Sequence, residues 1–285
     1  MTRAVTRTLS ICVLMPAIAL WVSFTAADAA PQGRVLRVCA DPDNLPFSNE
    51  HQEGFENRIA DLIAKDLNAT VQYRWMPQRR GFVRLTLKAG DCDLVPGVPS
   101  EYDMVLATKP YYRSTYVFVS ATRRHLQLRS FDDPALRGLR IGIHASAEDG
   151  YNQPPAHALA RRGLAGNIHG FKMFDEESVI NPQGRIIDAV ASGDIDVAIV
   201  WGPFGGYFAR REKVAMDVTP VSPSVDPPAL PFTYEISMGV RKGEDAFKSE
   251  LEGILDRRRA AIRKILDEFG VPIVAAAETS KGVRT

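Results

Sequence analysis

Cysteine and histidine are scarce in this chain of 285 residues, which contains three cysteines and five histidines. No two cysteines have the spacing C-x-x-C, and the histidines form neither H-x-x-x-H nor H-E-x-x-H. Zinc sites and thiol redox motifs are therefore disfavoured. No Ser-His-Asp order and no glycine loop for phosphates stands out either. We therefore predict no metal, no cofactor and no catalytic residue.

A strong net charge is also missing. The full chain carries +1 at pH 7, and removal of a leader that contains Arg3, Arg7 and Asp28 leaves it neutral. Such a chain has no overall field to attract nucleic acid or an anionic membrane. No repeat with a period of about 20–50 residues is evident, which disfavours a solenoid.

The first 29 residues have the pattern of a secretory signal peptide. Arg3 and Arg7 precede an apolar run at residues 11–24, and Ala-Asp-Ala at residues 27–29 has the small residues of a cleavage site. An uncleaved anchor is the competing interpretation, but a bilayer span needs about 20 apolar residues. We expect cleavage after Ala29, a periplasmic location and no membrane insertion of the remaining chain.

The residues that follow alternate between strand and helix patterns. Leu36 and Val38 supply an apolar strand, and apolar residues then recur at helical spacing over residues 55–67. Further strands are expected at residues 71–75, 94–98 and 116–120. A short helix is expected over residues 81–89, with Phe82, Leu85 and Ala89 facing inward. This alternation predicts an α/β fold with a mainly parallel sheet.

A second α/β run follows a polar segment at residues 121–134. The sequence patterns place its strands at residues 139–143, 168–174 and 195–201, and its helices at residues 155–162 and 186–192. After a proline-rich stretch, residues 235–240 are strand-like and residues 245–269 form a long helix. We therefore predict two lobes joined by two hinge crossovers. The first lobe comprises residues 30–120 plus 231–285, and the second is inserted at residues 121–230.

Two cysteines, Cys39 and Cys92, remain once the leader is removed. In an oxidising compartment an even pair predicts a disulfide more readily than a metal or catalytic site. Cys39 lies in the first strand, and Cys92 directly precedes the strand at residues 94–98. If these strands are neighbours, the disulfide closes a loop of roughly fifty residues and contributes about 4 kcal/mol in the chain-entropy description.

Four short motifs occur in the order found in one protein family. They are LKAGDCDLVPG at residues 87–97, PYY at residues 110–112, GLRIGI at residues 138–143 and GDIDV at residues 193–197. Together they resemble the type II periplasmic solute-binding proteins of family 3 over essentially the whole mature chain. The resemblance implies an α/β fold of two lobes, each a mainly parallel sheet flanked by helices, with a ligand cleft between them.

The charged residues that amino-acid binders of this family use do not match. Those proteins place an arginine shortly after the position of Gly97, but the next arginine here is Arg113. They place an acidic residue after the strand that matches residues 195–200, where this chain has Trp201. A zwitterion buried without these partners would cost several kcal/mol. The sequence therefore disfavours an ordinary amino-acid receptor.

Four longer segments narrow the resemblance: PFSNEHQEGFEN, MPQRRGFVR, DCDLVPGVPSEYDMV and KPYYRSTYVFV. In combination they resemble the MxaJ/XoxJ-type accessory proteins of bacterial methanol dehydrogenase systems. The resemblance implies a periplasmic, monomeric factor that assists a pyrroloquinoline-quinone (PQQ) methanol dehydrogenase, or its cytochrome c, by protein contact or an apolar cleft. The alternatives are the substrate-binding component of an ABC transporter for a small solute and, more remotely, a dehydratase-like enzyme.

Several cleft candidates have a second interpretation. Arg80 stands where amino-acid binders often place an aromatic platform, but a salt bridge to Asp41 or Asp103 is at least an equal alternative. Trp201 is expected either to stack on a ligand or to pack in the core. The predicted cleft residues are Asp41, Asn44, Phe47, Arg80, Pro99, Tyr102, His144, Ser146 and Trp201.

Tyrosines gather along the predicted hinge strand. Tyr111, Tyr112 and Tyr116 lie just before or within the strand predicted at residues 116–120. We interpret them as packing residues of the hinge rather than as cleft residues.

Overall fold

Strands and helices alternate along the residues that the computed structural model describes, which are 33–145, 153–173 and 181–275. The predicted signal peptide lies outside these residues. None of the helices in the described part is both long and apolar enough to cross a bilayer.

The helices of these residues, apart from short 3-10 turns, are α1 (Phe55–Asp66), α2 (Phe82–Leu85), α3 (Pro154–Arg161), α4 (Arg185–Ser192), α5 (Gly202–Ala209) and α6 (Asp245–Glu268). The strands are β1 (Arg34–Ala40), β2 (Asp43–Asn44), β3 (Ser48–Asn49), β4 (Ala69–Trp75), β5 (Val95–Pro99), β6 (Leu106–Ala107), β7 (Tyr112–Ala121), β8 (Ile141–Ala145), β9 (Ile168–Lys172), β10 (Val197–Trp201), β11 (Met216–Pro220), β12 (Val225–Asp226), β13 (Leu230–Pro231) and β14 (Thr233–Val240).

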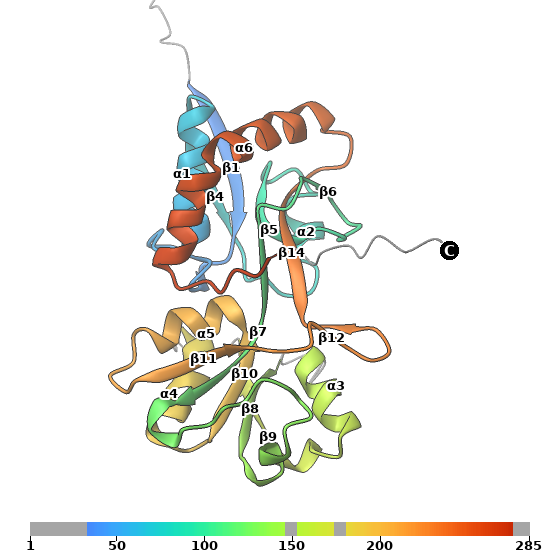
Figure 1. The fold of residues 1–285 in the computed structure, drawn as a ribbon. Helices are drawn as coiled ribbons and strands as arrows, with labels where there is room; N and C mark the ends of the chain where they lie inside the picture. Colours follow the sequence, from blue (N-terminus) through green and yellow to red (C-terminus); the bar gives the residue numbers. More distant parts are fainter. Residues whose placement is uncertain (1–32, 146–152, 174–180, 276–285) are drawn as a thin grey trace, which may run out of the picture. The chain divides into compact units, whose positions relative to one another are not determined.

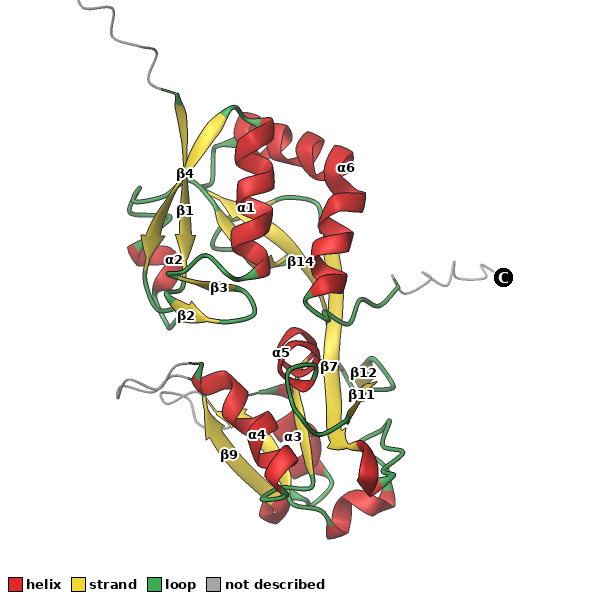
Figure 2. Ribbon diagram, turned by 90° about the vertical axis from the view of Figure 1, so that its left-hand side faces the viewer, coloured by secondary structure: helices red, strands yellow, loops and turns green. Residues whose placement is uncertain are grey.

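The first lobe is built on the parallel pair β1 and β4, and a parallel bridge from Val38 to Leu94 links β1 to the start of β5. Helices α1 and α6 lie side by side against this sheet (Figures 1 and 2). Successive strand residues point to opposite faces. Leu36 and Val38 therefore join the core under α1 and α6, whereas Cys39 joins a second core with Phe82 of α2.

A disulfide closes the second of these cores. Cys39 and Cys92 are bonded, with their Cα atoms 5.6 Å apart, so the predicted pairing is confirmed. The backbone N–H of Cys39 donates to the carbonyl of Leu94 at 2.8 Å. The strand that contains Cys39 and the strand that follows Cys92 are therefore neighbours, as the sequence analysis assumed.

The second lobe is a sheet in which β8 pairs in parallel with both β9 and β10. β7 borders β10, and its side chains alternate between two cores. Val117 and Val119 pack with residues of α4 and α5, whereas Phe118 packs with Leu159 of α3 on the other face. The sheet is thus covered by helices on both faces.

Two strands carry the chain between the lobes. β7 contributes Tyr112 to a core of the first lobe and Phe118 to a core of the second. β14 returns beside it and pairs antiparallel with it, from Thr233 opposite Thr115 to Ile236 opposite Tyr112. Within the described residues, every antiparallel pair of the eight-stranded sheet includes β7 or β14. Two crossovers therefore join the lobes, as predicted.

The exact limits of the lobes are a separate question. From Gly33 onward the chain clusters as one compact unit. The lobe limits expected at residues 120 and 231 therefore stay a prediction.

The helix predicted at residues 81–89 was wrong in its length and its inward face. α2 ends at Leu85 after a single turn, and the Leu85 side chain is 48% exposed. Ala89 is exposed as well, whereas Leu87 is fully buried. Leu85 is the last residue of α2, and beyond it the chain no longer follows a 3.6-residue period, so the inward position expected at Ala89 does not apply.

Candidate functional site

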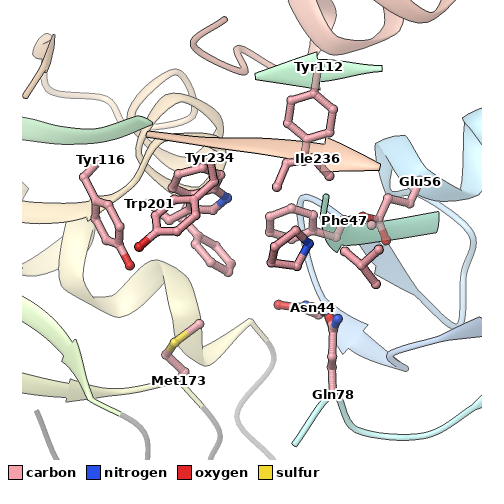
Figure 3. A pocket seen from close by; sticks show the side chains of 14 residues that line it. Asn44, Phe47, Glu56, Gln78, Tyr112, Tyr116, Met173, Trp201, Tyr234 and Ile236 are labelled. Carbon is pink, nitrogen blue, oxygen red and sulfur yellow. Dashed lines mark hydrogen bonds between the residues drawn. The ribbon is translucent and has the colours of Figure 1, made fainter. Parts of the chain in front are cut away.

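A cavity of about 310 Å³ lies where β5, β7, β10 and β14 meet the loops of the first lobe. Figure 3 shows Tyr116, Trp201 and Tyr234 grouped on one side of it, with Phe47 and Glu56 opposite. Among described residues the lining is Asn44, Phe47, Glu56, Gln78, Gly97, Val98, Pro99, Tyr112, Tyr116, Met173, Trp201, Phe204, Tyr234 and Ile236.

The cavity lies where several strands of the two lobes end. Parallel strands of an open α/β sheet end at a common edge, and the loops beyond that edge usually line the ligand site. Asn44 follows β1, Gln78 follows β4 and Trp201 is the last residue of β10. Helix α5 begins directly after Trp201, and Phe204 lies in its first turn. The cavity is therefore built from both lobes.

The aromatic rings contact one another edge to face. The ring centroid of Trp201 lies 5.5 Å from that of Tyr116 and 5.7 Å from that of Tyr234. Across the cavity, the Phe47 ring of the first lobe lies 5.1 Å from Phe204 of the second. Such pairs hold the rings in fixed orientations and leave faces available to a ligand.

Glu56 is the acidic residue of this lining. It is the second residue of α1 and only 8% exposed, and its carboxyl receives no hydrogen bond from any described residue. Burial, and to a lesser degree the charge of Asp41, raise the pKa of Glu56 from 4.5 to about 8. The carboxyl therefore keeps its proton near neutral pH.

The loop after β1 holds polar groups in fixed positions. The carboxylate of Asp41 accepts hydrogen bonds from the backbone N–H groups of Asp43 and Gln78. Burial raises the pKa of Asp41, and these two hydrogen bonds oppose the rise. The Nδ2 of Asn44 donates to Oε1 of Gln78 at 3.4 Å, while its buried Oδ1 has no partner among the described residues. Asp41 thus organises the loop, and Asn44 leaves an acceptor unused.

The two lobes also touch at the edge of the cavity. The Nε2 of Gln183 donates to the carbonyl of Asp43 at 2.9 Å, and the N–H of Asn181 donates to Asp43 Oδ1 at 3.3 Å. Behind this contact, His144 Nε2 lies 2.9 Å from the carbonyl of Gln183. Burial lowers the pKa of His144 from 6.5 to about 4, so the ring is neutral at pH 7. These contacts hold the lobes together beside the cavity.

The structure places the predicted cleft residues in three groups. Four of them line the cavity: Asn44, Phe47, Pro99 and Trp201. Four others lie elsewhere among the described residues, since Asp41 is buried in the loop, Arg80 is exposed, Tyr102 contacts Met104 Sδ through its hydroxyl at 3.1 Å, and His144 lies behind Phe204. Ser146 lies outside the described residues. As ligand contacts, all nine stay predictions.

Other lining residues were not anticipated. Glu56 and Gln78 lie in segments that carried the resemblance but were not named as cleft residues, Phe204 was not named at all, and Tyr112 and Tyr116 were interpreted only as packing residues. The alternation along β7 is the signal that could have found Tyr116, because it faces away from Val117 and Val119. The described residues contain no group of three or more His, Cys, Asp or Glu side chains placed to hold a metal ion.

Known proteins match this chain along most of its length. The family description "bacterial extracellular solute-binding proteins, family 3" fits residues 36–271. The chain belongs to this family. An extracytoplasmic location follows, and the chain is a binding protein rather than an enzyme because the family consists of solute-binding proteins.

Relatives of this family 3 binding protein confirm the narrower resemblance. This chain is 29% identical to the protein MoxJ of Methylorubrum extorquens AM1 over 282 residues, which are 96% of this chain and 93% of that protein. It is 38% identical to the crystal structure of periplasmic binding protein XoxJ from Methylobacterium extorquens AM1, with a TM-score of 0.70 over 85% of this chain and 100% of that one.

A second solved structure supports the same fold. MxaJ from Methlophaga aminisulfidivorans MPT is 25% identical, with a TM-score of 0.73 over 84% of this chain and 100% of that one. The predicted α/β fold of the two-lobed, type II class is therefore confirmed, and so is the resemblance to MxaJ/XoxJ-type proteins.

Proposed function

We propose that this family 3 binding protein is a periplasmic accessory factor of methanol oxidation. In this proposal it assists a PQQ-dependent methanol dehydrogenase, or the cytochrome c of that enzyme, by receiving a segment of the partner in its aromatic cleft. The similarity to XoxJ and MxaJ supports a role in methanol oxidation. The predicted signal peptide at residues 1–29 would deliver the chain to the periplasm, where it would act as a monomer.

The composition of the cavity is the observation that carries this proposal. Its described lining has six aromatic side chains and neither lysine nor arginine. A free amino acid would therefore bury its carboxylate without a cationic partner, which costs several kcal/mol. Aromatic and aliphatic side chains of a polypeptide carry no such cost, and each one fully buried contributes about 1.5–3 kcal/mol. The cleft thus suits a protein segment better than a zwitterion.

A substrate-binding role in an ABC transporter is the alternative, with an unidentified small solute. The contact of Gln183 with Asp43 across the cavity edge favours it, because transport receptors alternate between open and closed lobes. The volume of about 310 Å³ also lies at the lower end of the range for small-molecule pockets.

A binding measurement tests the proposal. The purified protein is titrated with the PQQ methanol dehydrogenase of the same organism, and separately with its cytochrome c. We expect binding that Trp201→Ala weakens by roughly ten- to hundredfold, since buried aromatic anchors dominate such interfaces. Leu85→Ala is the matched control, because Leu85 is an exposed hydrophobic residue outside the cavity.

A thermal-shift screen of amino acids, sugars and alcohols separates the two roles. A bound solute raises stability by RT ln(1 + [L]/Kd). A large shift with one solute, together with no binding to the dehydrogenase or the cytochrome, would reject the accessory role in favour of transport.

A further inference from the structure

Two polar groups in the cavity wall have no partner among the described residues. One is Oδ1 of Asn44, a buried atom on a residue 6% exposed, and the other is the carboxyl of Glu56, which lines the cavity on a residue 8% exposed and receives no hydrogen bond from a described residue. A polar atom shielded from water without a hydrogen bond is costly, and a ligand that supplies the missing hydrogen bond would remove that cost. Oδ1 of Asn44 accepts hydrogen bonds, and the carboxyl of Glu56, which can donate one while it is protonated, accepts them through both oxygens once it is ionised. A ligand that donates hydrogen bonds would therefore satisfy both groups in the ionised state.

The surroundings of Glu56 specify the charge of that donor. The titratable groups that influence it or are influenced by it are Asp41, Tyr73, Tyr111 and Tyr112, none of which is a cation at neutral pH. No lysine or arginine lines the cavity within the described residues. A ligand that brought its own positive charge would stabilise the ionised carboxyl, whereas an anion would meet no cationic side chain in the described lining.

The opposite wall suits the organic part of such a ligand. Trp201, Tyr116 and Tyr234 group together there (Figure 3). The ring of Phe47 also packs edge to face against the ring of Phe204. Aromatic faces attract ammonium groups and alkyl chains alike. A hard metal ion needs several oxygen ligands, and one carboxyl among aromatic rings does not supply them.

We infer that the cleft binds an alkylammonium group, with Glu56 as its counter-ion and the aromatic rings of the cavity as its cage. The group is either a free alkylamine or the lysine side chain or amino terminus of a docked protein. The inference deepens the proposed function, since it uses the same cleft and names the chemistry that the cleft recognises.

Calorimetry with n-butylammonium and the neutral analogue 1-butanol tests this inference. At pH 8 the wild-type protein should bind n-butylammonium at least tenfold more tightly than 1-butanol. Because binding must remove the proton of Glu56 below pH 8, the affinity should rise almost tenfold per pH unit from pH 6 to pH 7.5 and level off above pH 8. At pH 7, titrations in two buffers of different ionisation enthalpy should show release of about one proton.

Two variants assign the effect to one carboxyl. Glu56→Gln should lose both the preference for n-butylammonium and its pH dependence, while Glu50→Gln, at an exposed position outside the cavity, should keep both. Should Glu56→Gln fail to fold, the pH profile and proton release of the wild-type protein decide the matter. Equal binding of n-butylammonium and 1-butanol, or an affinity independent of pH, would overturn the inference.

Competition with the dehydrogenase shows whether the ammonium group comes from a free amine or from a docked protein. It also separates the ammonium site from the accessory function. If n-butylammonium displaces the dehydrogenase, the ammonium group belongs to that partner; if both bind together, it belongs to a free amine. No preference for n-butylammonium with intact dehydrogenase binding rejects the ammonium site alone. Binding of n-butylammonium without any binding of the dehydrogenase or of its cytochrome c rejects the accessory function alone.

Discussion

Oε1 of Glu56 lies 2.2 Å from the point where a Cβ on residue 97 would stand, so the glycine at 97 leaves room for the buried carboxyl. The two residues come from different elements, α1 and β5, and both line the cavity. The obstructing atom is the end of a flexible side chain rather than backbone. A methyl group at position 97 would therefore displace the carboxyl and leave the strand in place.

Gly97→Ala should separate binding from stability. We expect the free energy of unfolding to change by no more than about 1 kcal/mol, because the Glu56 side chain can change rotamer. Binding of n-butylammonium should fall at least tenfold, since the carboxyl no longer reaches its place in the wall. Gly138→Ala is the control, because a Cβ there would meet no atom within 4 Å. Unchanged binding by Gly97→Ala would show that the position of this carboxyl does not matter.

The raised pKa of Glu56 predicts that stability falls as pH rises from about 4.5 to about 8. The folded protein holds the proton up to about pH 8, whereas the unfolded chain releases it near 4.5. The stabilising contribution is thus complete below pH 4.5 and is lost as pH rises through 8, at up to about 1.4 kcal/mol per pH unit. Urea unfolding between pH 6.5 and 8 should show this decline in the wild-type protein and a weaker decline in Glu56→Gln. Parallel curves for the two proteins would contradict the prediction.

The lowered pKa of His144 predicts that stability falls as pH decreases, which is the opposite of the effect of Glu56. Its pKa is lowered to about 4 in the folded protein, while the unfolded chain takes up a proton near 6.5. Its contribution is present above pH 6.5 and is lost as pH falls through 4, again at up to about 1.4 kcal/mol per pH unit. His144→Gln should therefore lose less stability than the wild-type protein between pH 6.5 and 4.5. The exposed His169→Gln serves as control and should follow the wild type.

The contact between Gln183 and Asp43 predicts how readily the lobes separate. Gln183→Met keeps the length of the side chain but removes the donor to the Asp43 carbonyl. It also removes Oε1, a buried acceptor without a partner among the described residues, so stability should change by only about 1 kcal/mol. Small-angle scattering should show a larger radius of gyration than for the wild type. Gln127→Met, at an exposed site, should not. Identical scattering from all three proteins would mean that this contact does not hold the cleft closed.

The long elements could be predicted because their apolar patterns extend over many residues. The patterns indicated α1, α6, β7 and β10, and these elements formed within a few residues of their expected limits. Short elements could not be predicted in the same way. β2 and β3 have two residues each, which is too few for any period, and α2 ends after one turn so that Leu87 replaces Leu85 in the core.

The cavity lining was predictable where a residue lies at a strand end or in the loop just beyond it. Pro99 and Trp201 end β5 and β10, and Asn44 and Phe47 lie in the segment after β1. Glu56 was not predictable, because a glutamate in the first turn of a helix is already explained by the helix dipole, and its burial depends on Gly97 in a distant strand. Arg80 was expected inside on family grounds alone, and the loop after β4 leaves it exposed.

β7 contributes side chains to a core of each lobe and, with β14, forms the connection between the two lobes. Since the two strands are hydrogen-bonded to each other, they form one shared ribbon between the lobes, and a separation of the lobes would deform that ribbon. Tyr116 and Tyr234 are mounted on that ribbon and project into the cavity. Any opening movement would consequently rotate part of the recognition surface itself, so that the shape presented to an incoming molecule differs from the shape that finally encloses it.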